Sequence, residues 1–362
     1  MIRLGNLQID APFYQAGLAG YSDHAMRVVA REHGCPHCVT EAMLDHFLIA
    51  GGKARHAAEI PDNDHPITGQ LMGSNPHDIA RGAAILADLG YDVIDVNLAC
   101  PVKKIKKKAR GGHLLSATDT AIDILKAVRD AVPDEIPLTV KLRRASDDSP
   151  EAAQRFFAIF EATIDNDYAG ATVHGRTVEQ KYIGPSNWGF LADLTQRYRD
   201  AANRTGTFTI GGSGDVWTAR DIFRMIQQTG VHWVSVARGC IGNPWIFRQA
   251  RALLDNNPDE ADRPPTIHEQ RAVLLRHFEC SLQLHGEIPA SKMMRKFGIK
   301  FARHHPRADD IKNAFISVST LADWHHVLDR FYTTNGPGRL ADPENATQNA
   351  FARNDDACPT PG

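Results

Sequence analysis

Short apolar runs alternate with longer amphipathic segments along most of the chain, from about residue 9 to residue 250. Apolar runs bounded by turn residues predict buried strands, whereas apolar positions that recur every three or four residues predict helices with one buried face. On this pattern we expect eight strands, at residues 13–18, 37–41, 67–72, 93–97, 138–142, 170–174, 207–211 and 233–237.

Helical patterns fill most of the gaps between these strands, at residues 76–89, 118–131, 150–165 and 216–229. The first and the third follow Asn or Ser and begin with Pro, which suits a helix start because the missing N–H needs no partner there. Repeated strand–helix units predict a parallel sheet. Eight units of ~30 residues predict a (β/α)8 TIM barrel, whose active site lies at the carboxyl ends of the strands. Periodicity leaves a doubly wound α/β sheet open as the alternative.

The composition changes after the last predicted strand and helix. Residues 255–266 are rich in Asp, Asn and Pro and predict a linker. Residues 267–333 show helical patterns without strands, and the polar end of the chain predicts disorder. We therefore expect a barrel domain at 1–254, the linker, a smaller all-helical domain at 267–340 and a disordered tail at 341–362.

Net charge and cysteine content limit the partners and the setting. The net charge is −2, so the whole protein is not a basic nucleic-acid binder and any RNA site must be a local patch. The chain is far too long for its six cysteines to serve as a disulfide framework. Its start lacks the apolar stretch of a signal peptide, and no run reaches the ~18 apolar residues of a membrane span. We expect a reducing, cytoplasmic setting with no membrane partner.

Cys100 ends a strand-like run and is followed at once by a block of cations. A thiol that donates a proton or attacks as a nucleophile needs access, which a strand-end loop provides. A buried structural thiol is the alternative. The cations suit a polyanion such as RNA, with a solvated loop as the alternative. They are Lys103, Lys104, Lys106, Lys107, Lys108 and Arg110.

Other candidate residues also lie at predicted strand ends. Lys141 lies inside an apolar strand, where an ammonium is costly unless its charge is used; an edge-strand lysine facing water is the alternative. Glycine-rich turns at 211–215 and 237–247 follow the seventh and eighth strands, where many barrels bind phosphate. Cys35 and Cys38 have the spacing of half a zinc site, but such a site needs about four ligands, so we expect no metal.

These motifs, taken in order, resemble those of the tRNA-dihydrouridine synthases, a family of flavin enzymes. Residues 93–115 resemble the family's D-x-N-x-G-C-P signature and its basic continuation. Residues 141–143 match K-[IL]-R, residues 174–177 match H-G-R-T, and residues 242–247 read Gly-Asn-Pro-Trp-Ile-Phe as in the family. Residues 16–23 correspond to A-P-M-A-G-V-T-D.

The resemblance extends over about residues 11–310, with a few departures. Ala99 and Ala237 stand where the family has Gly, and Ser213 stands in place of Asn. Gly17 and Leu18 replace the family's Pro and Met, which is the clearest departure and could loosen that loop.

The resemblance implies an enzyme that reduces the C5=C6 bond of uridine in tRNA. Reduced FMN would deliver hydride to C6, Cys100 would protonate C5, and NADPH or NADH would act as the reductant. The uridine would be flipped out of the tRNA fold, because a stacked ring cannot be reached. We also expect the protein to act as a monomer.

By the same resemblance, a group of residues at the barrel mouth should bind FMN: Gly17, Leu18, Ala19, Gln70, Asn97, Lys141, His174, Ser213, Gly214, Asp215, Ala237 and Arg238. A second group should contact the substrate uridine or tRNA: Asn97, Lys103, Lys104, Lys106, Lys107, Lys108, Arg176, Arg295, Lys296 and Lys300. The residue patterns alone allow plainer interpretations, namely a turn-capping Asn97, a solvent-facing Gln70, an ordinary loop His174 and a solvated basic helix at 292–303.

Two other functions stay open. A barrel flavoenzyme acting on a small molecule would keep the FMN residues without needing the lysine block or the helical domain. A non-catalytic tRNA-binding relative could have lost the flavin through the departures at Gly17 and Ser213, although Cys100, Lys141, His174 and Arg176 argue against this.

Overall fold

The computed structural model describes residues 1–102, 110–204 and 206–340. The predicted tRNA contacts at Lys103, Lys104, Lys106, Lys107 and Lys108 lie outside the described residues, as does the tail at 341–362.

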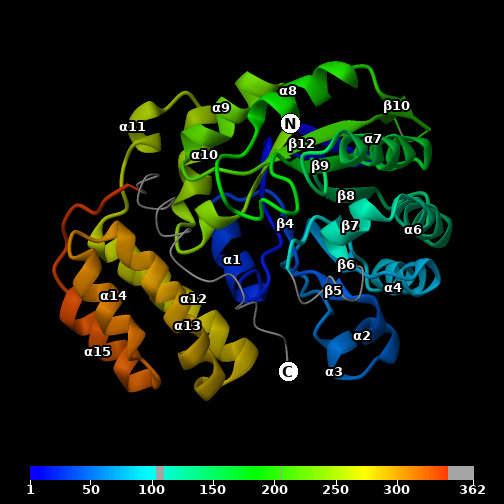
Figure 1. The fold of residues 1–362 in the computed structure, drawn as a ribbon. Helices are drawn as coiled ribbons and strands as arrows, with labels where there is room; N and C mark the ends of the chain where they lie inside the picture. The colour runs from blue at the N-terminus through cyan, green and yellow to red at the C-terminus, as the bar shows by residue number, and fades with distance from the viewer. Residues whose placement is uncertain (103–109, 205, 341–362) are drawn as a thin grey trace.

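Eight parallel strands close into a barrel (Figure 1). They are β3 (Phe13–Gln15), β4 (Cys38–Val39), β6 (Ile67–Met72), β7 (Val93–Leu98), β8 (Leu138–Arg143), β9 (Gly170–His174), β12 (Thr209–Ser213) and β13 (Trp233–Val236). The last strand, β13, pairs with the first, β3, and β3 pairs with β4. A short strand, β5 (Met43–Leu44), adds to β6. The TIM-barrel prediction is confirmed, and the doubly wound alternative is wrong because the pairing of β4 with β6 closes the eight strands into a ring.

Helices surround the barrel (Figure 1). They are α1 (His24–Glu32), α2 (Asp45–Ala50), α3 (Lys53–His56), α4 (Pro76–Asp88), α6 (Thr118–Ala131), α7 (Pro150–Asp165), α8 (Trp188–Arg197), α9 (Ala219–Thr229) and α10 (Trp245–Leu254), with 3-10 turns η1 (Gly111–Ser116) and η2 (Arg238–Cys240). Asn75 and Ser149 cap α4 and α7 through their side chains, as the Asn-Pro and Ser-Pro starts predict.

A small hairpin covers the amino-terminal end of the barrel. β1 (Ile2–Leu4) pairs antiparallel with β2 (Leu7–Ile9). Ile2, Leu4 and Ile9 share a buried cluster with residues near the starts of barrel strands, including Val93 and Trp233. We call the opposite end, where the barrel strands finish, the barrel mouth. A second hairpin joins β10 (Ala202–Asn203) to β11 (Gly206–Thr207).

Some predicted bounds are wrong, for local reasons. The first strand ends at Gln15 instead of residue 18, because the chain turns at Gly17, where a Cβ would lie 2.2 Å from the Thr40 carbonyl oxygen. The seventh strand begins at Thr209, since Thr207 belongs to the second hairpin. The helix predicted at residues 216–229 is α9, which starts at Ala219 because Thr218 forms a capping box with Asp221.

The carboxyl-terminal region is helical, as predicted. It contains α12 (Ile267–His285), α13 (Glu287–Phe301), η3 (Ala302–His304), α14 (Ala308–Ile316) and α15 (Leu321–Phe331). Its core is continuous with that of the barrel: the Trp245 ring on α10 lies 5.7 Å from the Phe301 ring on α13. The division of the chain into separate domains stays a prediction.

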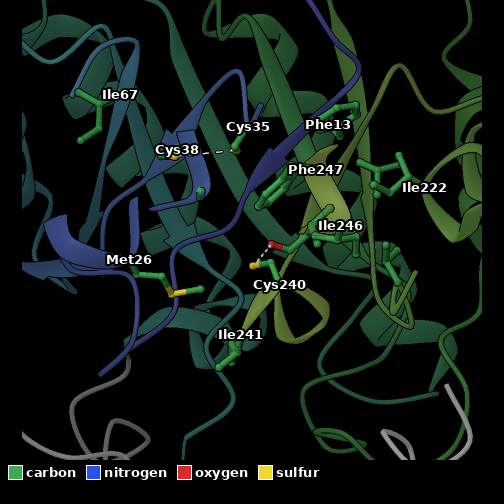
Figure 2. Close-up of a cluster of buried hydrophobic side chains, with 14 of the residues drawn as sticks. Phe13, Met26, Cys35, Cys38, Ile67, Ile222, Cys240, Ile241, Ile246 and Phe247 are labelled. Carbon is green, nitrogen blue, oxygen red and sulfur yellow. Dashed lines mark hydrogen bonds between the residues drawn. The ribbon is translucent and has the colours of Figure 1, made fainter. Parts of the chain in front are cut away.

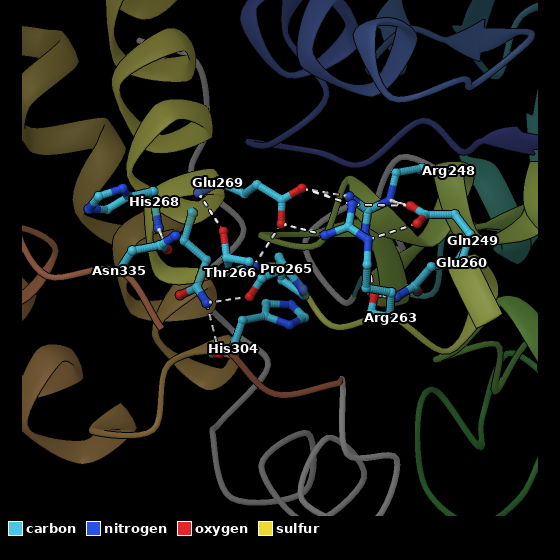
Figure 3. Close-up of polar contacts among 11 residues, drawn as sticks. Arg248, Gln249, Glu260, Arg263, Pro265, Thr266, His268, Glu269, His304 and Asn335 are labelled. Carbon is cyan, nitrogen blue, oxygen red and sulfur yellow. Dashed lines mark hydrogen bonds and ion pairs between the residues drawn. The ribbon is translucent and has the colours of Figure 1, made fainter. Parts of the chain in front are cut away.

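The segment predicted as a linker contains a short helix, α11 (Pro258–Ala261). Figure 3 shows the ion pairs that join this segment to α10 and to α12. Arg263 pairs with Glu260 on α11 at 2.7 Å and with Glu269 on α12 at 2.9 Å. Arg248 on α10 reaches both carboxylates at 3.1 Å. The segment thus ties the last barrel helix to the helical region.

Cys35 and Cys38 lie in the hydrophobic core (Figure 2). Their sulfur atoms are 3.9 Å apart, and Cys35 Sγ donates to the His37 carbonyl. Across residues 1–102, 110–204 and 206–340, no three His, Cys, Asp or Glu side chains gather as a metal ion would need. Within the same ranges, every helix is too short or too polar to cross a membrane.

Candidate active site

The barrel mouth brings together side chains from five strands that are far apart in sequence. Gln70 lies on β6, Asn97 on β7, Lys141 on β8, His174 on β9 and Ser213 on β12. In the strand register, Asn97 stands opposite Lys141, and His174 stands opposite Ser213. Parallel strands place all their carboxyl ends at one edge, so these residues share the open end of the barrel.

Lys141 points into the barrel. Its Nζ donates to Ser213 Oγ at 3.2 Å, a contact that crosses the interior because β9 separates the two strands. The edge-strand alternative is wrong, since β8 is paired on both sides. The pKa of Lys141 is lowered to about 7, mainly by burial and then by the Arg143 charge, against the opposing effect of Asp95. Lys141 therefore titrates near neutrality and offers an enclosed cation to an anionic group.

His174 is the last residue of β9 and is held as a neutral hydrogen-bond donor. Its Nδ1 accepts the backbone N–H of Arg176 at 3.1 Å, which leaves the ring proton on Nε2. Burial holds the pKa of His174 well below its usual range, and the charges of Arg143 and Lys141 act in the same direction. A neutral imidazole N–H can donate to a carbonyl or phosphate oxygen at the mouth.

Gln70 and Asn97 belong to a buried chain of hydrogen bonds. Gln70 is buried, so the solvent-facing alternative is wrong. Its Nε2 donates to Asp95 Oδ2 at 2.9 Å, and its Oε1 accepts from Asn97 Nδ2 at 2.7 Å. Thr139 Oγ1 donates to Asp95 Oδ1 at 2.7 Å. Asp95 begins the D-x-N signature but carries no role among the sequence predictions, although a carboxylate inside an apolar strand, on the same face as Asn97, carries the signal already used for Lys141.

The loop that carries Cys100 is fixed by its neighbours. Asn97 Oδ1 accepts the backbone N–H groups of Ala99 and Cys100 at 3.0 and 3.1 Å, so Asn97 does cap this turn. Arg143 Nε donates to the Ala99 carbonyl at 2.9 Å. Cys100 is partly exposed, whereas the other four described cysteines are buried. Its position thus suits a reacting thiol better than a structural one.

Arg143 also connects this loop to the loop after β9. Its Nη1 donates to the carbonyls of Thr177 and Lys181, both at 2.7 Å. The guanidinium groups of Arg143 and Arg238 lie 5.4 and 4.8 Å from the centre of the Tyr182 ring. Arg143 stands in a motif noted in the sequence, but its role as an anchor depends on contacts that no local pattern reveals.

The glycine-rich turn after β12 has a closely packed backbone. Gly214 has a φ of +113°, and a Cβ there would lie 2.4 Å from Ser186 Oγ. The Asp215 carboxylate accepts two hydrogen bonds from Arg176 Nη2, at 2.7 and 2.9 Å, and one from the Ser186 backbone at 2.6 Å. Arg176 is 1% exposed and also donates to the Gly184 carbonyl. Arg176 and Asp215 therefore form an ion pair with each other. The predicted contacts of Asp215 with flavin and of Arg176 with substrate stay predictions.

The turn after β13 adds a cation to the mouth. The Arg238 guanidinium, 25% exposed, lies 4.9 Å from the Trp217 ring and 3.7 Å from Asp215 Oδ1. Ala237 precedes it and is partly exposed. With Lys141 and Arg143, Arg238 makes this end of the barrel electropositive.

The loop after β3 is braced from two sides. Leu18 N–H donates to Ser22 Oγ at 2.7 Å, and Gly20 N–H donates to Glu41 Oε2 at 2.7 Å. Lys296 on α13 donates to the Gly20 carbonyl and lies 4.7 Å from the Tyr21 ring. Gly17 and Leu18 are partly buried and Ala19 is exposed.

The predicted tRNA contacts on α13 differ in exposure. Lys296 is half-buried against the barrel, and burial lowers its pKa. Lys292 is exposed, and Arg295 and Lys300 are partly exposed. The solvated-helix alternative therefore fails for Lys296, while the phosphate contacts stay predictions.

Comparisons with known proteins agree with this geometry. The family model for dihydrouridine synthase matches residues 14–335. A probable tRNA-dihydrouridine synthase of Treponema pallidum is 30% identical over 332 residues, which cover 90% of this chain and 95% of that protein. tRNA-dihydrouridine synthase B of Vibrio vulnificus is 25% identical over 320 residues, covering 88% and 94%.

Two solved structures resemble the chain in fold. Morphinone reductase, solved as a mutant with tetrahydroNAD, has a TM-score of 0.50 and 12% identity, covering 71% of this chain and 90% of that chain. Histamine dehydrogenase from a Rhizobium species has a TM-score of 0.53 and 14% identity, covering 77% and 50%. At such identities the likeness shows the fold alone.

Proposed function

The chain belongs to the dihydrouridine synthase family, and from this premise we propose that it reduces the C5=C6 bond of uridine in tRNA to give 5,6-dihydrouridine. The observation that carries the proposal is the partly exposed thiol of Cys100, whose loop is held by Asn97 and Arg143 at the end of the barrel that also carries Lys141 and His174. A proton donor next to cationic and neutral hydrogen-bond donors suits the reduction of a polarised double bond.

The residues at the mouth fit a flavin. An isoalloxazine ring with a phosphate offers carbonyl oxygens and negative charge, and the site offers Lys141, the Nε2–H of His174 and the Arg238 guanidinium. The Ser213 hydroxyl, the hydrogen-bond partner of Lys141, carries no charge. Gly17 and Gly214 keep the backbone free of side chains where a Cβ would collide. We propose FMN as the flavin, with NADPH as reductant and NADH as the alternative.

In the proposed reaction, this chain's residues position the uracil and move one proton. When bound, the flavin would supply the reducing equivalents that reach C6. Cys100 Sγ–H would give its proton to C5 and then regain a proton from water, so the thiol is restored after each turnover. Asn97 holds the backbone of Cys100 so that the thiol keeps its place at the mouth. The uridine must leave its stack in the tRNA to enter the barrel mouth, because a stacked base cannot reach the thiol.

A strain that lacks this protein tests the proposal in cells. We expect its tRNA to lose dihydrouridine at one or more positions, because the family implies a position set by how the whole tRNA lies on the enzyme. Mapping of dihydrouridine along individual tRNAs, with the gene restored as control, gives the readout. An unchanged dihydrouridine map would contradict the proposal.

Lys141→Met should weaken flavin binding in a pH-dependent way. The cation that favours an anionic ligand is present below the pKa of about 7 and is lost as the pH rises through it. We therefore expect the affinity of the normal protein for FMN to fall from about pH 6 to about pH 9, and that of Lys141→Met to be lower and flatter. Binding of FMN measured at several pH values gives both curves. Any change in the protonation of FMN itself affects both proteins equally.

The exposed Lys126 on α6 provides the matched control, since Lys126→Met removes a cation far from the mouth. It should bind FMN as the normal protein does. Equal pH dependence in Lys141→Met and the normal protein would exclude Lys141 from the flavin site.

His174→Ala should also lower the flavin retained after gel filtration.

Neutralising cations on α13 should weaken tRNA binding. The triple variant Lys292→Gln, Arg295→Gln and Lys300→Gln leaves Lys296 on its Gly20 contact. If the three cations meet phosphates, the logarithm of affinity should depend less steeply on the logarithm of salt concentration, by ~0.7–0.9 for each phosphate that is no longer neutralised. Filter binding at low and moderate salt measures this slope.

The control neutralises Arg81, Lys126 and Arg199, which are exposed on or next to the outer barrel helices. That variant has the same net charge but should keep the slope. Identical slopes for both variants and the normal protein would remove α13 from the RNA contact.

A further inference from the structure

Asp95 is a buried carboxylate in the barrel interior, the Asp of the D-x-N signature, to which the sequence predictions assign no role. It is 6% exposed and accepts hydrogen bonds from Thr139 Oγ1 and Gln70 Nε2, at 2.7 and 2.9 Å. Thr139 comes from β8 and Gln70 from β6, so Asp95 joins the strands on both sides of β7. A buried carboxylate is costly unless it is hydrogen-bonded, and here both oxygens have a donor.

The carboxylate gives the hydrogen-bond chain a direction. A carboxylate only accepts, whereas an amide accepts on one side and donates on the other. Because Asp95 accepts, Gln70 must turn its NH2 toward Asp95 and its carbonyl toward Asn97. Asn97 must then present its NH2 to Gln70, at 2.7 Å. Its carbonyl is left to face the backbone N–H groups of Ala99 and Cys100.

Charge supports this arrangement. Burial raises the pKa of Asp95 to about 6, while Thr139, Gln70 and Lys141 act in the opposite direction. The group is therefore largely ionised at neutral pH, the form that only accepts. Asp95 is thus connected to the Cys100 loop through the side-chain amides of Gln70 and Asn97.

We propose that Asp95 is a positioning residue that sets the direction of the Gln70 and Asn97 amides and thereby holds the Cys100 loop at the barrel mouth. The proposal deepens and rests on the proposed function, in which Cys100 donates the proton. Asp95 acts on the loop through Gln70 and Asn97.

Replacement of Asp95 by Asn should remove the fixed direction of the hydrogen-bond chain while nearly keeping the volume of the side chain. Asn at position 95 can turn either its carbonyl or its NH2 toward Gln70. In the reversed arrangement, Asn97 presents its NH2 to two backbone N–H groups, and both hydrogen bonds to the loop are broken. Since each is worth about 0.7 kcal/mol, within the usual range for a hydrogen bond, loss of both should make the loop open ~10-fold more often.

The first readout is alkylation of Cys100 by iodoacetamide in flavin-free protein, followed by mass spectrometry of the Cys100 peptide. Rates are compared at the alkaline plateau, where a change in the thiol pKa no longer contributes. Asp95→Asn should raise the plateau rate ~10-fold. Asp221→Asn removes another buried carboxylate, in the capping box of α9, and should leave the Cys100 rate unchanged.

A double variant tests direction instead of mere packing. In Asp95→Asn with Gln70→Glu, the carboxylate moves one place along the chain. It accepts from Asn at position 95 and from Asn97, so Asn97 again turns its carbonyl to the loop. The plateau rate should return to within about threefold of normal, since the loop hydrogen bonds are restored. If Asp95→Asn alone does not fold, the double variant still carries the test, because the relay predicts that it folds and protects Cys100.

The outcomes separate this inference from the proposed function. Asp95→Asn with an unchanged plateau rate, or a double variant as reactive as the single one, would overturn the role of Asp95 even where the normal protein forms dihydrouridine. A normal protein that forms none, with alkylation behaving as expected, would overturn the proposed function and leave the relay standing. In an active enzyme, Asp95→Asn should also lower kcat for tRNA by ~10-fold, with KM within about threefold.

Discussion

Replacement of Cys100 by Ala is expected to lower dihydrouridine formation by ~10²-fold or more, the scale of a lost general acid. The flavin should stay bound and should still be reduced by NADPH, because the thiol serves only the step in which uracil C5 gains its proton. The side chain is partly exposed at the mouth, and its backbone is held by Asn97, so loss of the sulfur should leave the loop in place.

Two half-reactions measured on one preparation give the result. NADPH-dependent bleaching of the flavin reports the first, and dihydrouridine formed in tRNA reports the second. Cys280→Ala is the matched control, since Cys280 is a buried thiol on α12, away from the mouth. Near-normal tRNA turnover by Cys100→Ala would remove Cys100 from the mechanism.

Replacement of Arg176 by Ala is expected to destabilise the fold by ~2–3 kcal/mol, the scale of lost hydrogen bonds to a charged group, because the Arg176 side chain is buried while Asp215 is 26% exposed. Arg176 is 1% exposed, and its removal takes two hydrogen bonds and the nearer of two cations from Asp215, since Arg238 stays 3.7 Å away. The loop after β9 also loses the hydrogen bond from Arg176 to the Gly184 carbonyl. Urea unfolding followed by circular dichroism gives the free energy of unfolding.

Arg197→Ala provides the comparison, because Arg197 forms an exposed pair with Glu161 at 3.2 Å. Such pairs contribute ~0–1 kcal/mol. If Arg176→Ala changed the free energy of unfolding by no more than Arg197→Ala does, the pair with Asp215 would not be a structural element, and Arg176 would be available to flavin or substrate.

The regular parts of the barrel follow from the sequence because their patterns are local. β6 and β9 have the predicted bounds, as do α6 and α7. Buried parallel strands are continuous apolar runs, and Pro150 after Ser149 marks a helix start by its chemistry alone. The short first strand escaped prediction because its end depends on the Thr40 carbonyl, which packs against Gly17.

The site was predictable as a set of residues but not as a set of contacts. The motifs place Gln70, Asn97, Lys141 and His174 at strand ends, and the fold gathers them at one mouth. The pairing of Arg176 with Asp215 spans 39 positions, and that of Lys296 with Gly20 spans 276. Such pairings depend on how distant loops and helices meet, which no local spacing records.

The most direct test of the central claim uses the purified protein, FMN, NADPH and tRNA that contains no dihydrouridine. The account predicts that NADPH is consumed and that dihydrouridine accumulates at one or more defined uridines, with one NADPH used for each uridine reduced. Mass spectrometry of nuclease fragments identifies the positions, and Cys100→Ala supplies the background. Flavin reduction by NADPH with no dihydrouridine in any tRNA offered would contradict the account.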